Sequence, residues 1–189
     1  MTHNARTGNT DQNRIRQRIR EGKYREALVF CIQEHGSEVG QFCMAILGDQ
    51  TETEDTLKEV FIAFYDAMNS IDDDDDIRLR IFEIARWMCA RRVEARGERK
   101  PPYTSDRPSA MDVDAFDQVV DKLPFVHWMH EALEYLRPSE RDSLILRYQA
   151  GLSYTEIGQV CQKEESVAIK QTSKALLRLR TYLKDKVVV

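Results

Sequence analysis

Residues 137–180 read RPSERDSLILRYQAGLSYTEIGQVCQKEESVAIKQTSKALLRLR, and this stretch decides the fold of the C-terminal part of the chain. Pro138 stands where a helix would begin, and an apolar-periodic helix then ends at Gly151. Ser153 and Glu156 have the spacing of a capping box, in which each side chain accepts a hydrogen bond from the other residue's backbone amide. The pattern therefore predicts that a second helix begins directly after Ser153.

The rest of this stretch predicts two helices joined by a tight polar turn. The first is short and ends at about Cys161, and the second is long and begins at about Ser166. Such a pair, with a basic outer face on the second helix, is typical of a helix-turn-helix, whose second helix enters the major groove of DNA. The residues expected to form its frame are Ser153, Glu156, Ile157, Val160 and Ala168.

The outer face of the long helix contains the candidate DNA contacts. Lysine and arginine can meet phosphates or guanine edges, and glutamine can pair with adenine. The candidates are Lys170, Gln171, Ser173, Lys174 and Arg178. The inward face is expected to contain Ala168, Thr172, Ala175, Leu179 and Leu183. An ordinary solvated helix face is the alternative interpretation of these charges.

The helix-turn-helix segment resembles region four of bacterial sigma factors, most closely those of the small extracytoplasmic-function (ECF) group. The similar residues are Leu136-Arg137-Pro138, Glu140-Arg141, Leu146-Arg147-Tyr148 and Gly151 through Gly158. The N-terminal half resembles region two of the same family. The similar residues there are Gly22 through Leu28, Leu47-Gly48-Asp49, Glu52 through Asp55, Glu59-Val60-Phe61 and Ile84-Ala85-Arg86.

This resemblance extends over roughly residues 19 to 183 and implies an all-α fold of two small helical domains. The expected parts are a basic N-terminal tail (1–21), a region-two-like domain (22–99), a flexible acidic linker (100–124) and a region-four-like domain (125–189). The net charge of −4 hides strong segregation, since residues 77–100 carry eight Arg and Lys against three Glu. Local basic helices of this kind are what a DNA contact needs.

Periodicity places several helices in the N-terminal half. They are expected over Asp11–Arg20, Tyr24 to about Glu34, Ser37 to about Leu47, from Thr51 with Glu54 completing a capping box, and Ile77 to about Gly97. The predicted core residues of the last two are Leu57, Phe61, Phe64, Met68, Ile77, Ile81, Ile84 and Met88. The run Asp72–Asp76 is expected to be a loop, because adjacent like charges repel one another.

The outer face of the helix from Thr51 predicts a docking surface, because an exposed Ile62 within charged residues resembles an interface centre with a polar rim. The candidate residues are Glu54, Asp55, Glu59, Ile62 and Asp66. The family resemblance implies that they dock on the clamp helices of the largest subunit of core RNA polymerase, and that the chain also meets the flap of the second largest. An ordinary acidic face with one stray isoleucine is the alternative.

The helix from Ile77 contains candidates for contact with the minus-10 promoter element. Arginine neutralises phosphate, and an aromatic ring stacks on unpaired bases. The candidates are Arg80, Arg86, Trp87, Arg91 and Arg92. The family resemblance implies that this helix and the preceding loop open the DNA there, although Asp72–Asp76 would repel a DNA strand. Packing of Trp87 against a neighbouring helix is the alternative.

No catalytic activity, cofactor or metal site is expected. The sequence contains no phosphate-binding glycine loop and no nucleophile elbow, and its four cysteines lack metal-ligand spacing. Scattered cysteines, with no signal peptide and no apolar run that could span a bilayer, predict a cytoplasmic protein.

The predicted function is that of a sigma factor. It would bind core RNA polymerase and read promoter DNA through a minus-10 and a minus-35 contact, and an anti-sigma factor is a further expected partner. Two other interpretations remain open. One is a stand-alone helix-turn-helix regulator, and the other is a sigma-like interaction module with degenerate DNA binding. The interaction module stays open because of the acidic run Asp72–Asp76 and because the start of the recognition helix is atypical. Relatives usually have a Gly-Thr-Val-Lys-Ser-Arg-like run there, where this chain has Ser166 to Gln171 after two acids, Glu164 and Glu165.

Overall fold

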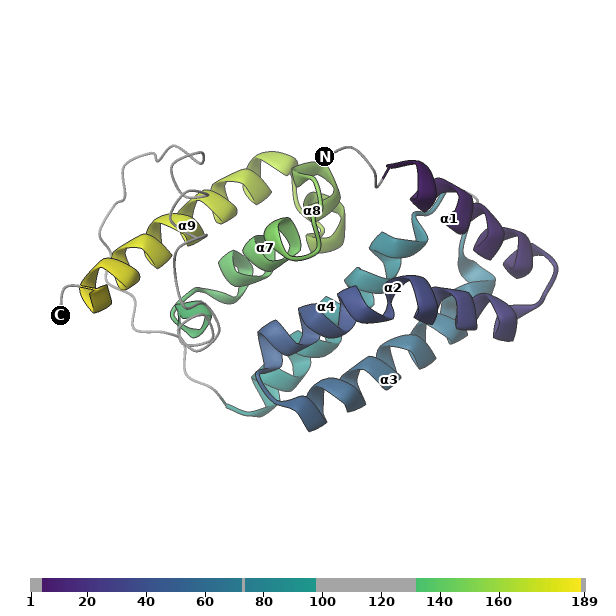
Figure 1. Cartoon of the computed structure of the whole chain (residues 1–189), viewed down its shortest axis with the longest axis horizontal. Coiled ribbons are helices and arrows are strands. Elements are labelled where there is room, and N and C mark those ends of the chain that lie inside the picture. The colour runs from purple at the N-terminus through teal and green to yellow at the C-terminus, as the bar shows by residue number, and fades with distance from the viewer. Residues whose placement is uncertain (1–4, 73, 98–131, 188–189) are drawn as a thin grey trace. The chain divides into compact units, whose positions relative to one another are not determined.

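The computed structural model describes residues 5–72, 74–97 and 132–187 (Figure 1). Within these ranges all regular secondary structure is helical, so the predicted all-α fold is confirmed. The chain divides into two compact units, Met1–Cys89 and Ala90–Val189. The expected linker, residues 100–124, lies outside the described residues.

Helices of the first unit follow one another closely along the chain. They are α1 (Ala5–Arg20), α2 (Tyr24–Leu47), α3 (Gln50–Ala67), the 3-10 turn η1 (Met68–Ser70) and α4 (Ile77–Ala95), whose end passes Cys89. Those of the second unit are α7 (Pro138–Tyr148), α8 (Tyr154–Cys161) and α9 (Glu165–Val187). Helix α2 packs against both α1 and α3, and α9 packs against both α7 and α8.

Helix α2 is one continuous helix, whereas the sequence pattern predicted two helices with a break between Glu34 and Ser37. Gly36 lies inside the helix, which ends instead at Gly48, where φ is 69°. Burial along both halves outweighs the roughly 1 kcal/mol by which an internal glycine disfavours a helix. The buried residues are Ala27, Cys31, Val39, Phe42, Cys43, Ile46 and Leu47.

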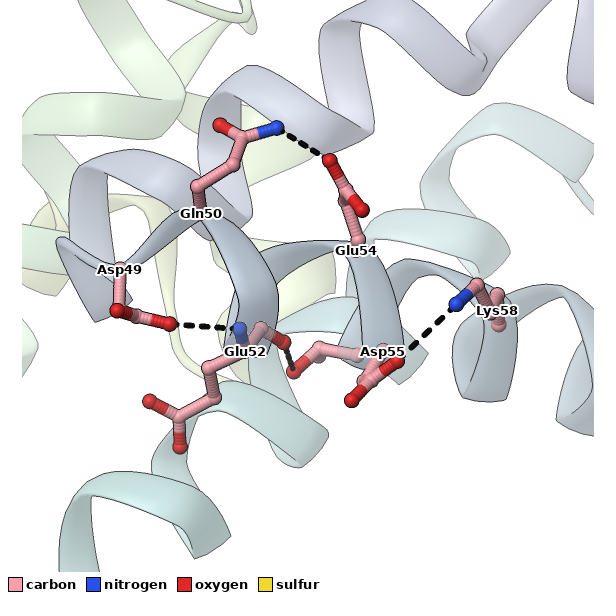
Figure 2. Close-up of polar contacts among 7 residues, drawn as sticks. Asp49, Gln50, Glu52, Glu54, Asp55 and Lys58 are labelled. Atoms are coloured by element: carbon pink, nitrogen blue, oxygen red, sulfur yellow. Dashed lines mark hydrogen bonds and ion pairs between the residues drawn. The ribbon is translucent and has the colours of Figure 1, made fainter.

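Helix α3 begins at Gln50, one residue before the predicted start at Thr51. Its N-cap is Asp49, whose carboxylate accepts a hydrogen bond of 2.8 Å from the amide of Glu52 (Figure 2). The predicted capping box of Thr51 and Glu54 is therefore wrong. Glu54 Oε1 instead accepts a 2.6 Å bond from the side chain of Gln50. Aspartate caps a helix at least as well as threonine, so the helix starts at the earlier position.

The core of the first unit joins α2, α3 and α4. Phe42 of α2 and Phe82 of α4 pack edge to face, with 5.6 Å between ring centroids. The predicted core residues that are buried are Phe61, Phe64, Met68, Ile77 and Ile81. Leu57, Ile84 and Met88 are partly exposed.

The core face of α4 is thus rotated relative to the prediction. Phe82, Ala85 and Cys89 are each 0% exposed and take the places expected for Ile84 and Met88. Apolar residues occur on more than one side of this helix, so their spacing alone could not choose the buried side.

The second unit confirms the predicted order of helix, short helix, turn and long helix. Pro138 is the first residue of α7. Both bonds of the predicted capping box are present, with Glu156 N donating to Ser153 Oγ over 3.2 Å and Ser153 N donating to Glu156 Oε2 over 2.6 Å. The capping box fixes the start of α8, and α9 follows after a short turn.

Candidate nucleic-acid interface and docking surface

Helix α9, the candidate recognition helix, is held in its unit by a face of small and aliphatic side chains. Ala168, Thr172, Ala175, Leu176 and Leu179 are each no more than 2% exposed. The hydroxyl of Thr172 donates to the carbonyl of Ala168 over 3.0 Å, which satisfies this buried polar group. The predicted inward residue Leu183 lies outside the residues whose side chains are described. Burial of this face leaves the opposite face of α9 open to solvent.

That opposite face contains three of the five predicted DNA contacts. Lys170 and Lys174 are exposed, and Ser173 is partly exposed. Ile169 is 40% exposed, although it was not among the predicted contacts. Its position four residues before Ser173 places these two side chains on the same side of α9, and this spacing could have identified it. An exposed aliphatic side chain here is suited to contact with a thymine methyl group.

The other two predicted contacts, Gln171 and Arg178, are directed at α7. Arg178 Nη1 forms an ion pair of 2.8 Å with Glu140 Oε2, and the two side chains are 18% and 3% exposed. The side-chain oxygen of Gln171 lies 3.1 Å from the hydroxyl of Ser143 and 3.5 Å from Lys163 Nζ. Both residues therefore lie on the flank of α9, between its buried face and its solvent face.

The turn of the helix-turn-helix closes tightly on Gly158. The amide of Lys163 donates to the carbonyl of Gly158 over 2.8 Å, and Gln162 adopts the left-handed conformation with φ of 54°. A β-carbon at Gly158 would lie only 2.7 Å from the carbonyl oxygen of Lys163. Gly158 was not among the predicted frame residues, and of those that were, Ile157 and Val160 are at most 1% exposed. The angle between α8 and α9 therefore depends on a glycine at this position.

The two acids at the start of the recognition helix, Glu164 and Glu165, accept hydrogen bonds from nearby hydroxyl groups. Glu165 Oε2 accepts a 2.9 Å bond from the hydroxyl of Thr155, and Glu164 Oε2 accepts a 3.4 Å bond from the hydroxyl of Ser166. Negative charge at this end is favourable for the helix dipole. Glu165 thus joins α8 to α9, and both acids stabilise the start of the helix.

The predicted docking face of α3 is solvent-exposed as a whole. Ile62 is 61% exposed, the highest value among the large hydrophobic side chains that are exposed in the described residues. Glu54, Asp55, Glu59 and Asp66 are also exposed. Asp55 forms an ion pair of 3.1 Å with Lys58 (Figure 2). The face therefore presents one apolar side chain among acidic ones.

Helix α4 presents part of its predicted nucleic-acid surface to solvent. Trp87 is 53% exposed, so the indole is not enclosed by a neighbouring helix. Arg80 and Arg91 are exposed, whereas Arg86 and Arg92 are partly exposed. Arg80 Nη1 pairs with Glu83 Oε2 over 2.6 Å. An exposed ring flanked by arginines is a combination that can bind single-stranded nucleic acid.

Two carboxylates of the acidic loop before α4 accept hydrogen bonds from backbone amides. Asp75 Oδ2 accepts a 3.0 Å bond from the amide of Asp72, and Asp76 Oδ1 accepts a 3.1 Å bond from the amide of Leu79. Two residues of α1 also hold this loop. Gln12 Nε2 donates to Asp76 Oδ1 over 3.0 Å, and Arg16 donates to the carbonyl of Asp75 over 2.6 Å.

These bonds lessen the repulsion expected from the acidic run. The loop is a turn that caps α4, with Asp72, Asp74 and Asp75 exposed. Asp73 lies outside the described residues.

Among the described residues, no group of three or more His, Cys, Asp or Glu side chains could hold a metal ion. No described helix has the length and apolarity needed to cross a membrane. All four cysteines are buried free thiols, and burial raises the pKa of Cys31 to about 12.

Comparison with known proteins identifies the fold. No protein-family model and no curated protein matches the sequence. CnrH, solved in complex with the cytosolic domain of CnrY, is similar with a TM-score of 0.70 and 17% identity, over 93% of this chain and 98% of that one. The sigma factor RpoE, solved with the anti-sigma factor NepR from Bartonella quintana, is similar with a TM-score of 0.58 and 19% identity, over 80% of this chain and 95% of that one. The resemblance to ECF sigma factors is therefore confirmed at the level of the fold.

Proposed function

We propose that the chain is a sigma factor of the ECF kind, which binds core RNA polymerase and directs transcription initiation at specific promoters. The observation that supports this most is the extent of the structural likeness. It covers 93% of the chain in the comparison with CnrH, so it includes the N-terminal unit as well as the helix-turn-helix. A helix-turn-helix alone occurs in many regulators, so the extension of the likeness to the N-terminal unit supports a sigma factor over a stand-alone regulator.

In this proposal the second unit reads the minus-35 element. The solvent face of α9 approaches the major groove, where Lys170 and Lys174 meet phosphates or base edges and Ser173 adds a polar contact. Ile169 is available for a thymine methyl group. The exposure of these four side chains on one face of one helix supports this assignment.

The first unit has two roles in the proposal. The face of α3 around Ile62 docks on the polymerase, because an exposed apolar centre with a charged rim suits a protein interface. The face of α4 around Trp87 engages the minus-10 element, where Arg80 and Arg91 neutralise phosphates. Docking and DNA contact thus use different helices of the same unit.

We also propose regulation by an anti-sigma factor. RpoE was solved with an anti-sigma factor and CnrH with the cytosolic domain of CnrY, so both similar proteins have a protein partner. Such a partner would act by covering the docking face of α3 or the DNA face of α9. As a sigma factor, the chain would function in the cytoplasm and would have no catalytic activity of its own.

The test is binding of the purified chain to bacterial core RNA polymerase, followed by run-off transcription on a library of genomic promoter fragments. We expect a stable complex and transcripts that begin at a shared sequence motif. A complex without transcripts would instead indicate an interaction module. Absence of any complex, together with binding of the chain as a dimer to palindromic DNA, would support a stand-alone regulator.

A further inference from the structure

Two polar contacts between α7 and α9 hold the flank of the recognition helix. Glu140 pairs with Arg178 over 2.8 Å, and Ser143 lies 3.1 Å from Gln171. Gln171 and Arg178 are seven residues apart, so they lie on the same side of α9. Their partners run in the opposite order along α7. The contacts therefore join the two helices at two separate points, and rotation of α9 about its own axis would break both.

Glu140 is already part of the start of α7. Its Oε2 accepts a 3.3 Å bond from the backbone amide of Arg137 and also accepts the bond from Arg178. The Glu140 side chain is 3% exposed, so these hydrogen bonds replace the contacts with water that its carboxylate loses on burial. A buried carboxylate that loses the cation it is paired with is strongly unfavourable. The guanidinium of Arg178 is thus tied to the interior of the unit.

The position of Arg178 along α9 is also unsuited to base contact. Side chains near the start of a recognition helix contact base edges. Arg178 lies 13 residues after Glu165, the first residue of α9, which is roughly 20 Å along the helix axis. Lys170 is much closer to the start and points to solvent.

We propose that Arg178 is a positioning residue, which fixes the rotation of the recognition helix through Glu140 and makes no phosphate or base contact of its own. Gln171 acts with it through Ser143. The DNA-reading set on α9 is then Ile169, Lys170, Ser173 and Lys174. This inference rests on the proposed function, and it assigns Arg178 a role different from the DNA contact that the sequence predicted.

The experiment compares Arg178→Met, Glu140→Gln and the double variant in the full-length chain. Arg178→Met leaves Glu140 buried without its cation, so we expect the melting temperature to fall by about 5–15 °C. Adding Glu140→Gln removes the uncompensated charge and keeps an acceptor for the Arg137 amide, so we expect at least half of the loss to be recovered. If Arg178→Met has the same melting temperature as the wild type, or if the double variant has the same melting temperature as Arg178→Met, the positioning role is wrong.

DNA binding supplies the second readout, on the duplex that the wild-type chain selects with core polymerase from a random library. All variants are measured at a temperature where they are folded. We expect Arg178→Met to lower the ratio of specific to non-specific affinity, and the double variant to restore it. The salt slope should be the same in both as in the wild type, since no phosphate contact is lost.

Lys174→Met is the matched control, because it removes one positive charge from the solvent face. It should reduce the salt slope by about 0.9 and leave the melting temperature unchanged. A slope reduction of that size in both variants of Arg178 would show that Arg178 contacts phosphate and would overturn the inference. If the wild-type chain selects no duplex, the proposed function fails, while the melting temperatures still decide whether Arg178 positions α9.

Discussion

A β-carbon at Gly158 would lie 2.7 Å from the carbonyl oxygen of Lys163 and 3.4 Å from the amide nitrogen of Glu165. We therefore expect Gly158→Ala to lower the stability of the second unit by about 1–3 kcal/mol, because the turn must shift to admit a methyl group. Native-state hydrogen exchange of the α8 amides measures this loss in the full chain.

Gly36→Ala is the control for this substitution. Gly36 is also inside a helix, but the nearest atom to its β-carbon would be Ile32 Cγ2 at 3.6 Å, an ordinary contact distance. Alanine there should raise stability by up to about 1 kcal/mol, through helix propensity alone. Equal protection of the α8 amides in Gly158→Ala and the wild type would contradict the prediction, because the turn would then admit the methyl group without loss of stability.

The thiol of Cys31 is expected to stay protonated well above neutral pH, because burial raises its pKa from 9.0 to about 12. The unfolded chain releases this proton first, so the contribution to stability is complete below about pH 9 and is lost as the pH rises towards 12. Alkylation with iodoacetamide at pH 8.5 should leave Cys31 unmodified in the folded chain and label it in urea.

The pH dependence of unfolding tests the same thiol. Between about pH 8 and pH 10 the wild type should lose about 1.4 kcal/mol more than Cys31→Ala, which has no proton to release. Parallel curves for the two proteins would contradict the raised pKa.

At the scale of the element, the N-terminus of α3 separates two possible caps. Asp49→Ala should lower the stability of the first unit by about 1 kcal/mol, since the amide of Glu52 loses its 2.8 Å acceptor. Thr51→Ala should change it by only a few tenths, because Thr51 is the second residue of the helix and not its cap. Urea denaturation followed by circular dichroism measures both losses of stability. A larger loss for Thr51→Ala than for Asp49→Ala would show that Thr51 is the cap, as the sequence predicted.

Sequence signals of short range predicted the second unit well. Pro138, the capping box of Ser153 and Glu156, and the polar turn all act within a few residues, so each could be recognised from the chain alone. The continuity of α2 and the rotation of α4 depend on burial against other helices. Periodicity does not contain that information when glycine is tolerated or when apolar residues occur on several sides.

In the candidate sites too, features of short range were predicted from the sequence and contacts between distant residues were not. Exposure of Ile62, Lys170 and Lys174 follows from helical spacing and was predicted. The pairing of Arg178 with Glu140 joins residues 38 positions apart, and no local pattern in the sequence indicates it. Likewise, the bonds of Gln12 and Arg16 to the acidic loop could be found only in the folded unit.

At the scale of the whole molecule, the proposed function divides binding between two units on one chain. In this proposal each unit would contribute one contact, and the covalent connection would make the second contact effectively intramolecular once the first has formed. A defect in one unit should therefore weaken promoter recognition without abolishing the activity of the other unit. Substitutions on the exposed faces of α3 and α9 can separate the two.

We expect Ile62→Asp to prevent binding to core polymerase, because it places a charge at the centre of the docking face, while the chain stays folded since Ile62 is 61% exposed. Lys174→Glu should have the opposite effect, leaving polymerase binding intact and weakening the minus-35 contact by at least tenfold at low salt. Gel filtration with core polymerase and promoter binding by the assembled complex measure the two losses. Circular dichroism of each variant is the control for folding. If Ile62→Asp loses helix, the side chain stabilises the first unit, and if it binds polymerase normally, docking uses another face.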